Sequence, residues 1–391
     1  MQTAERYNAI VEKMLDYVEN NRTDQAAGVM RVPVETYTDP ALWAREMELI
    51  FKRLPIMVAV SGEIPEPGDY KAMDILGKPL LVTRLADRSV RVMLNVCTHR
   101  GALLAEDGTG HRERFTCPYH AWTYGNDGAL QRIAGEKSFG EVDKCAHALT
   151  QLPCYERAGL VFAVLTPGLE VDFASYLGGM IEDIERLRFE DWHYSGSREI
   201  RGANWKVAYD GYLEGYHFAA AHKETIFPRS YSNIMQFDAH GPHLFIGFPQ
   251  KTIAKLREVP RAELWTHEND GYDFIRLLFP NVSIFVAPEL TQIAQLIPGP
   301  TVAENRTVLY FLHRQAPADA EQDGRNQQMI DWLKGVVDSE DYRLGLTVQR
   351  GLESGALGHV VFGKNERGNQ FFHKWIDYCL ADDPGLPKPI L

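Results

Sequence analysis

The sequence predicts an α+β protein, in which a β-rich domain is inserted before or within a larger α+β domain that has a central antiparallel sheet. Three observations support this prediction. Short β-type runs separated by Gly, Pro and Asp turns fill residues 55–167, helical patterns return after residue 168, and β-type runs resume over residues 243–312. The 391 residues are enough for two domains with a substantial apolar core.

These changes of pattern divide the chain into three segments. We expect a helical arm over residues 1–45 that packs on the larger domain. The β-rich domain is expected over residues 46–167 and the larger domain over residues 168–391.

Helical patterns occur at both ends of the chain. Apolar residues recur at helical spacing between Ile10 and Val18, which predicts an amphipathic helix over residues 1–21. A second helix is predicted to begin at Asp39-Pro40, an N-cap acid followed by proline at the first helical position, and to end near Phe51. A third helix is predicted over residues 318–352, and the segment 204–222 also has a helical pattern.

Composition and charge exclude several classes of protein. The formal net charge is -12, whereas a general binder of nucleic acid or of anionic membranes needs clustered Lys and Arg. No apolar run is long enough to cross a bilayer. The N-terminus lacks the basic start and the apolar centre of a signal peptide, so we expect a cytoplasmic protein that binds neither nucleic acid nor membranes.

Two cysteine–histidine pairs stand at short spacing in the β-rich segment. The chain has five cysteines, and an odd count in a large, non-secreted chain fits thiols or metal ligands better than a disulfide framework. Two of them begin the motifs Cys97-Thr-His99 and Cys117-Pro-Tyr-His120, each where a β-type run gives way to a loop. A [2Fe-2S] cluster with two Cys on one iron and two His on the other needs this ligand set. Zinc is the alternative, although zinc fingers normally pair Cys with Cys and His with His.

Two further histidines occur in the larger domain. His217 and His222 are separated by four residues, and two His with one carboxylate on Fe(II) leave positions open for O2 and substrate. On a regular helix, residues five apart are displaced by roughly 140°, so both imidazoles cannot reach one ion. A π-bulge or a helix end near residues 219–221 would remove this conflict.

The motifs resemble those of one known family. CTHRGALLAEDG at 97–108 and CPYHAWTYGNDGAL at 117–130 resemble the Rieske signature of ring-hydroxylating oxygenases. The stretch from Asn204 to His222 resembles the mononuclear-iron motif of the same family. The resemblance implies that Cys97, His99, Cys117 and His120 hold a [2Fe-2S] cluster and that His217 and His222 bind Fe(II).

The same resemblance suggests the third iron ligand. SEDYRLGLTVQRGLESG resembles the segment that supplies the carboxylate, and the match falls on Asp341. Periodicity supports this assignment, because Asp341 heads an apolar helical stripe expected to face the core (Leu344, Gly345, Val348 and Leu352). An ionised carboxylate on a core face is costly unless it is paired or metal-bound. Asp338 is the alternative ligand, and Glu340 is expected to be an exposed acid in the first turn of the helix.

Two acids upstream of His217 are candidate catalytic residues. The resemblance implies that Glu214 bridges a Rieske histidine to an iron-ligand histidine across a subunit boundary. The family commonly has Asp at this position, and members with Glu include oxygenases of quaternary ammonium compounds. Asp210 is a second candidate for this network, with an acid near a helix N-terminus as its alternative interpretation.

The resemblance also implies a reaction and its partners. We expect a terminal oxygenase that uses O2, with electrons from NADH or NADPH delivered by a reductase and, in some systems, a ferredoxin. It would hydroxylate or oxidatively dealkylate an aromatic substrate as a homotrimer, or as α3β3 with a small β subunit. Two alternatives remain open: a monooxygenase of a quaternary ammonium or other aliphatic substrate, and a Rieske electron-transfer protein without oxygenase activity.

Overall fold

The computed structural model describes residues 2–391, so Met1 of the predicted arm lies outside the described residues. The chain forms two compact units. The smaller unit contains Phe51–Tyr176 and Ile184–Asp191, and the larger unit contains the chain up to Ile50, Leu177–Asp183 and Trp192–Leu391.

The smaller unit is built from three antiparallel sheets, which confirms the predicted β-rich domain. The first sheet contains, in spatial order, β10 (Gln151–Leu152), β5 (Val90–Leu94), β4 (Lys78–Arg84), β3 (Asp69–Ile75) and β6 (Gly108–His111). The second contains β11 (Cys154–Arg157), β12 (Leu160–Ala163) and β2 (Ile56–Val60). The third contains β7 (Arg114–Thr116), β8 (Thr123–Gly125) and β9 (Leu130–Arg132). Three short helical segments complete the unit: η2 (Ser61–Glu63), α4 (Glu136–Phe139) and η3 (Phe189–Asp191).

One core cluster of the smaller unit supports the cysteine–histidine loops. It joins residues of the first and third sheets, including Leu81, Phe115 and Tyr124, which are each 0% exposed. Cys97 and Cys117 belong to the same cluster. The two cysteines are therefore fixed by the packing of the β strands beneath them.

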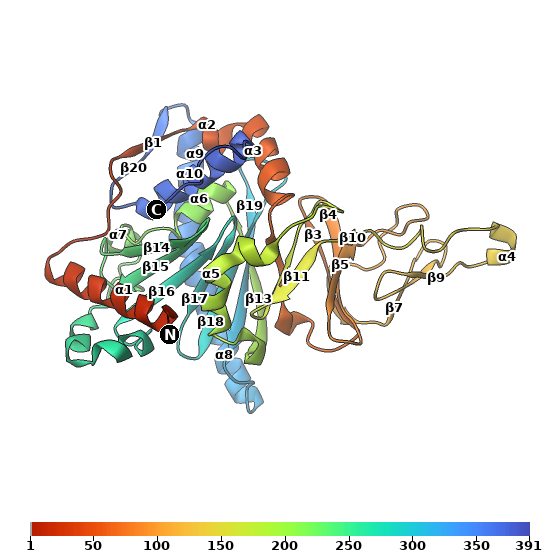
Figure 1. The fold of residues 1–391 in the computed structure, drawn as a ribbon, viewed down its shortest axis with the longest axis horizontal. Helices are drawn as coiled ribbons and strands as arrows, with labels where there is room; N and C mark the ends of the chain where they lie inside the picture. Colours follow the sequence, from red (N-terminus) through yellow and green to blue (C-terminus); the bar gives the residue numbers. More distant parts are fainter. Residues whose placement is uncertain (1) are drawn as a thin grey trace. The chain divides into compact units, whose positions relative to one another are not determined.

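The larger unit is organised around a seven-stranded antiparallel sheet, which confirms the predicted central sheet (Figure 1). Its strands, in spatial order, are β13 (His193–Gly202), β19 (Asn305–His313), β18 (Leu290–Pro298), β17 (Val282–Val286), β16 (Tyr272–Leu278), β15 (His243–Pro249) and β14 (Gln236–His240). The short strands β1 (Met30–Pro33) and β20 (His359–Phe362) pair with each other.

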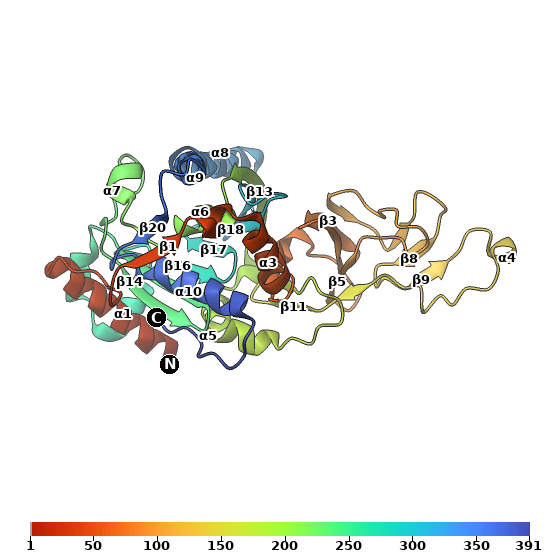
Figure 2. The same cartoon turned by 90° about the horizontal axis from the view of Figure 1, so that it is seen from above.

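Helices pack against this sheet: α1 (Gln2–Glu19) contacts β14 and β15, α6 (Trp205–Asp210) contacts β18 and β19, and α8 (Ala320–Val336) and α9 (Arg343–Glu353) contact β13. The other helical elements of the larger unit are α2 (Glu35–Thr38), α3 (Pro40–Glu46), α7 (Phe218–Ala221), η4 (Ile253–Glu258), η5 (Arg261–Thr266), η6 (Val337–Tyr342) and α10 (Arg367–Ala381), while η1 (Met47–Phe51) and α5 (Phe173–Glu185) are divided between the two units. Two views agree that α1 and α8 lie on opposite faces (Figures 1 and 2).

The helical arm packs on the larger unit through the predicted apolar stripe of α1. Val11 and Met14 are fully buried, and Tyr7 stacks on Phe245 of β15 with ring centroids 5.2 Å apart. A Cβ atom at Gly247 would lie 2.8 Å from the Met14 sulfur, so a larger residue here would force the Met14 side chain to move.

The second predicted helix begins and ends as expected. The Asp39 side chain accepts a hydrogen bond from the Ala41 backbone amide, and Pro40 occupies the first helical position. Helix α3 then continues as the π-helical turn η1, which ends at Phe51.

The structure differs from two of the helical predictions in part. The segment from residue 320 to 353 is helical throughout, but it contains a π-helical turn (η6) between α8 and α9. The prediction of a helical pattern over residues 204–222 holds only for α6 and α7, because the chain leaves the helix between Asp210 and Phe218. Across residues 2–391, no helix combines the length and apolar character that a membrane span requires.

Candidate active site

Two loops of the smaller unit present the cysteine–histidine motifs, and they share one backbone pattern. In the first loop, the Gly101 amide donates to the Cys97 carbonyl at 2.9 Å; in the second, the Ala121 amide donates to the Cys117 carbonyl at 3.0 Å. Gly101 and Ala121 both have positive φ, 83° and 54°. Each loop therefore turns back on itself directly after its histidine, which projects the histidine from the loop tip.

The loops bring the two imidazoles and the two thiols together. The rings of His99 and His120 have centroids 4.8 Å apart, and both cysteines are buried, with the Cys117 thiol within hydrogen-bonding reach of Cys97. Within residues 2–391, Nδ1 of His99 and Nδ1 of His120 are buried and have no hydrogen-bond partner. Because a buried polar atom without a partner is costly, these two nitrogens fit metal ligands, and the donor set fits a [2Fe-2S] cluster.

Neighbouring side chains hold these donors in place. The indole of Trp122 stacks on His99 with an interplanar angle of 9° and a centroid distance of 4.8 Å. The Tyr124 hydroxyl lies 3.3 Å from the Cys97 sulfur and 3.0 Å from the Thr98 amide. Burial raises the pKa of Tyr124 to about 12, so the phenol remains a neutral donor that would stabilise a cysteine thiolate.

The local structure of the larger unit resolves the spacing conflict of the two downstream histidines. His217 is the N-cap and His222 the C-cap of α7, which is a single turn of four residues. His222 has φ -110° and ψ 41°, outside the helical region. Helix α7 therefore ends directly before His222. A helix end at this place was one of the two predicted solutions to the spacing conflict, and it allows the two imidazole rings to converge.

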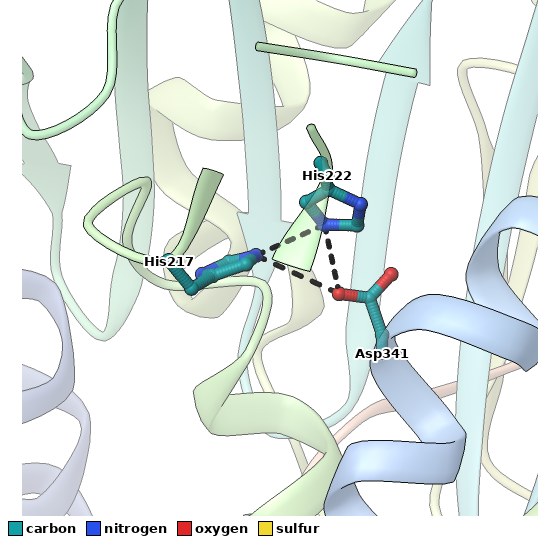
Figure 3. A group of neighbouring side chains, drawn as sticks. All are labelled: His217, His222 and Asp341. Atoms are coloured by element: carbon teal, nitrogen blue, oxygen red, sulfur yellow. Dashed lines mark hydrogen bonds and ion pairs between the residues drawn. The ribbon is translucent and has the colours of Figure 1, made fainter. Parts of the chain in front are cut away.

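These histidines meet Asp341 around one point (Figure 3). Nε2 of His217 and Nε2 of His222 are 3.1 Å apart, and Oδ1 of Asp341 lies 3.6 Å from the first and 3.0 Å from the second. One nitrogen from each ring and one carboxylate oxygen on one face of a metal ion match the arrangement of non-heme Fe(II) sites.

A carboxylate holds the outer nitrogen of each histidine. Nδ1 of His217 lies 2.5 Å from Glu214, and Nδ1 of His222 lies 2.5 Å from Glu340. Glu340 also accepts a hydrogen bond of 2.6 Å from the Thr225 hydroxyl. Such partners fix the ring orientation and leave Nε2 of each imidazole as the atom that could bind a metal ion.

Each ionisable side chain of this group has a partner within it. Burial lowers the pKa of His217, but hydrogen bonds with Asp341 and Glu214 outweigh burial and raise this pKa to about 10. Burial raises the pKa of Asp341, and its bonds to both histidines outweigh this effect and lower it. Without a metal ion, protons on the two imidazoles let them pair with the Asp341 carboxylate. A bound metal cation would replace these protons.

Asp341 points to the histidines because it lies in the π-helical turn η6. The expectation that its apolar stripe faces the core is wrong for Leu344 and Val348, which are 39% and 48% exposed, and only Leu352 is buried. Glu340 is not the exposed acid expected from the sequence, since it binds His222. Asp338 instead pairs with Lys334 on the helix surface.

Asp210 lies in a separate hydrogen-bond network. Its carboxylate accepts a bond of 2.8 Å from the Tyr37 hydroxyl and lies 3.1 Å from Nε2 of His373, while Asn369 donates to its backbone carbonyl at 3.0 Å. These contacts fix the end of α6, from which the chain continues to Glu214 and His217.

His217, His222 and Asp341 line a cavity of about 720 Å³ in the larger unit. Apolar side chains contribute most of its lining: Phe218, Ile226, Phe248, Ile275, Phe285, Leu290, Met329, Trp332, Leu333 and Val336. Helix α8 forms one wall, and the strands β15 to β19 form the floor. A substrate bound here would lie directly against the candidate metal site.

Glu340 gives a test of the metal site that does not depend on turnover. Replacing Glu340 with glutamine is expected to weaken Fe(II) binding by about 10–100-fold, because His222 loses a charged partner. Competition of the apoprotein with a coloured chelator for Fe(II) measures this change. Glu321→Gln, on the exposed surface of α8, is the matched control and should leave the affinity unchanged; equal affinities for all three proteins would contradict the assignment.

Comparison with known families identifies both units. Residues 55–156 match the model of the Rieske [2Fe-2S] domain, and residues 189–382 match the model of the ring hydroxylating alpha subunit (catalytic domain). The first match agrees with a [2Fe-2S] cluster rather than zinc, and the second favours an oxygenase over an electron carrier.

Individual relatives span most of the chain. The chloroplastic choline monooxygenase of Spinacia oleracea is 28% identical over 363 residues, which cover 89% of this chain and 78% of the relative. The carnitine monooxygenase oxygenase subunit of Escherichia coli (strain K12) is 27% identical over 369 residues, 90% of this chain and 94% of the relative. The crystal structure of naphthalene 1,2-dioxygenase from Rhodococcus sp. has the same fold, with a TM-score of 0.74 and 20% identity over 96% of this chain and 99% of that chain. The chain belongs to the Rieske non-heme iron oxygenases, as an alpha subunit with a Rieske domain and a ring-hydroxylating catalytic domain.

Proposed function

We propose that this oxygenase hydroxylates a largely apolar, ring-containing organic substrate bound in the cavity of about 720 Å³. The observation that carries the proposal is that His217, His222 and Asp341, the proposed iron ligands, themselves line this cavity. Cys97, His99, Cys117 and His120 are the proposed cluster ligands.

The lining supports an apolar substrate. Burying ring carbons against aromatic and aliphatic side chains contributes about 25 cal/mol per Å² of apolar surface removed from water. The charged groups of the lining are largely satisfied. Asp273 is bound by Gln250 at 3.0 Å and by Arg229 at 3.2 Å, and Glu289 is exposed to solvent.

The residues around the metal site have separate tasks. When bound, the cluster supplies single electrons and the Fe(II) ion supplies the site of O2 activation. Glu214 and Glu340 keep the two imidazoles in the tautomer that presents Nε2 to the metal. Asp210 positions the end of α6 through Tyr37 and His373.

Glu214 is also the proposed electron bridge. It holds His217, and its side chain is 11% exposed. We propose that a Rieske histidine of a neighbouring subunit reaches Glu214 in a homotrimer, or in an α3β3 assembly with a small β subunit. A reductase, with or without a ferredoxin, would supply the electrons from NADH or NADPH.

A quaternary ammonium substrate is the second candidate. The relatives named choline monooxygenase and carnitine monooxygenase favour it, as does the presence of glutamate at position 214. Aromatic faces attract such cations, and five aromatic side chains line the cavity: Tyr212, Phe218, Phe248, Phe285 and Trp332.

A substrate panel separates the two candidates. The metal-loaded enzyme with a compatible reductase is mixed with bicyclic aromatic compounds in one arm and with choline, carnitine and betaines in the other. Oxygen uptake that matches product formation in the first arm is the expected result. Coupled turnover in the second arm alone would replace the proposal by the quaternary ammonium activity.

Glu214→Gln tests the bridge. Glutamine keeps the size of the side chain but removes the charged partner of His217, so Fe(II) is supplied in excess to offset a weaker site. With both metal centres filled in this way, turnover should still fall by about 100-fold, as for removal of a key electrostatic group. The measurements are iron content, the spectrum of the reduced cluster, and the yield of product per cluster oxidised. Glu224→Gln makes the same chemical change at an exposed acid and should have no effect. Unchanged turnover in Glu214→Gln would remove the bridge from the proposal.

A further inference from the structure

Three neutral polar side chains lie on adjacent strands of the cavity floor, which is mostly apolar apart from these and Asp273 of β16. They are Ser283 on β17, Gln292 on β18 and His313 on β19, and all three line the cavity. They are only 3%, 8% and 7% exposed. Polar groups this deeply buried normally have a partner, so their presence on a cavity wall needs an explanation.

The strand register arranges these side chains in a diagonal line. Gln292 stands opposite Phe285 of β17 and Phe311 of β19. Ser283 is two residues from Phe285 on β17, and His313 is two residues from Phe311 on β19, so both side chains lie on the same face as Gln292. Ser283 and His313 are displaced from Gln292 toward opposite ends of β18. Diagonal neighbours in antiparallel strands are roughly 7–8 Å apart, so Gln292 is central and the other two flank it.

The hydrogen-bonding capacity of this line is available to a ligand. Nδ1 of His313 is 2.7 Å from the Ser195 hydroxyl, which leaves Nε2 for the cavity. Over the described residues 2–391, neither the Gln292 carboxamide nor the Ser283 hydroxyl has a hydrogen-bond partner. Burial lowers the pKa of His313, and the neighbouring His193 adds to this effect, so the imidazole is neutral at pH 7.

We propose that Gln292, flanked by Ser283 and His313, binds a neutral oxygen group, a carbonyl or hydroxyl, on the apolar substrate and so sets its orientation toward the metal site. This inference rests on the proposed function, because it assumes that the substrate occupies this cavity. A carboxamide both donates and accepts, so Gln292 can bind either group. A charged group would be buried among three neutral side chains at a high desolvation cost.

The neighbours of this line fit the rest of such a substrate. Phe285 and Leu290, beside Gln292 and His313 on the same face, offer apolar surface to a ring. One polar anchor on an apolar floor fixes the direction of a ligand that apolar contacts alone would leave free to rotate. The carbon presented to the metal site, and with it the position of hydroxylation, follows from that direction.

Matched ligands test the anchor directly. The probes are 1-tetralone and tetralin, which share a bicyclic body and differ by one carbonyl, and their binding to the metal-loaded enzyme is measured by isothermal titration calorimetry. The wild type should bind 1-tetralone about tenfold more tightly than tetralin, the typical contribution of one to two hydrogen bonds. Gln292→Met, which keeps the volume but removes the carboxamide, should reduce this preference to about threefold or less.

Gln295→Met is the control variant. Gln295 is also buried on β18, at 0% exposed, but lies on the opposite face, where it accepts a hydrogen bond of 2.9 Å from Tyr310. Its replacement should lower stability and leave the tenfold preference intact. Ser283→Ala, a smaller change, gives a second reading of the anchor if Gln292→Met does not fold, and it should also reduce the preference.

The outcomes separate this inference from the proposed function. No preference in the wild type, a preference that survives both Gln292→Met and Ser283→Ala, or no binding of either probe would overturn the anchor. A preference that depends on Gln292, in an enzyme that oxygenates neither arm of the substrate panel, would support the anchor and overturn the proposed function. Loss of the preference in Gln295→Met as well would also overturn the anchor, because the effect would then be general.

Discussion

Replacing Asp341 with alanine is expected to abolish oxygenase turnover and to lower the iron content from about three atoms per chain to about two. Asp341 supplies the only carboxylate oxygen among the three residues that converge on one point in the described chain. Its loss would leave His217 and His222 as a two-ligand site, too weak to retain Fe(II) during purification. The cluster should keep its spectrum, since its proposed ligands lie in the other unit.

Asp338→Ala is the control for this experiment. Asp338 is three residues away in the same π-helical turn, but it pairs with Lys334 and is 43% exposed. Iron analysis, the visible spectrum and product formation are measured on both variants. Retention of about three irons and of turnover in Asp341→Ala, with their loss in Asp338→Ala, would reassign the ligand to Asp338.

The largest expected effect on stability is at Glu46. Replacing Glu46 with alanine should lower the free energy of unfolding by about 3–5 kcal/mol, because it leaves the charge of Lys206 buried without a partner. Lys206 and Glu46 are both 0% exposed and 2.5 Å apart, and Glu46 also accepts a bond of 2.9 Å from the Trp205 indole. The pair fixes the start of α6, the helix that leads to the metal site.

Urea denaturation followed by circular dichroism measures the change at Glu46. Glu182→Ala, at an exposed position of α5, should change the free energy of unfolding by less than about 0.5 kcal/mol. The double variant Glu46→Gln with Lys206→Met removes both charges and should recover much of the loss. Equal, small effects of Glu46→Ala and Glu182→Ala would show that the pair contributes little.

Patterns within short stretches of sequence predicted much of the fold and site. The apolar spacing of α1 and the Asp39-Pro40 start of α3 are local signals, because each depends on residues within a few turns of helix. The two loops at Cys97 and Cys117 could also be predicted, because the spacing of each Cys and His and the turn residues that follow determine the shape of the loop.

Features that depend on distant residues were not predicted. Glu340 looks like a solvated acid in the sequence, and only the π-helical turn η6 brings it to His222, 118 residues away. The apolar stripe below Asp341 is largely exposed, because amphipathic spacing identifies a shared face and not what covers it. The line formed by Ser283, Gln292 and His313 depends on the register of three strands, which no local pattern fixes.

We expect one chain to hold two different iron centres, a histidine-ligated diiron cluster and a mononuclear ferrous ion. Mössbauer spectroscopy of the protein loaded with 57Fe tests it most directly, because the method resolves each kind of iron in one sample. We expect about two-thirds of the iron in a spin-coupled pair with two inequivalent sites, and about one-third as high-spin ferrous ion. A spectrum with a single iron environment, or one without the coupled pair, would contradict the claim.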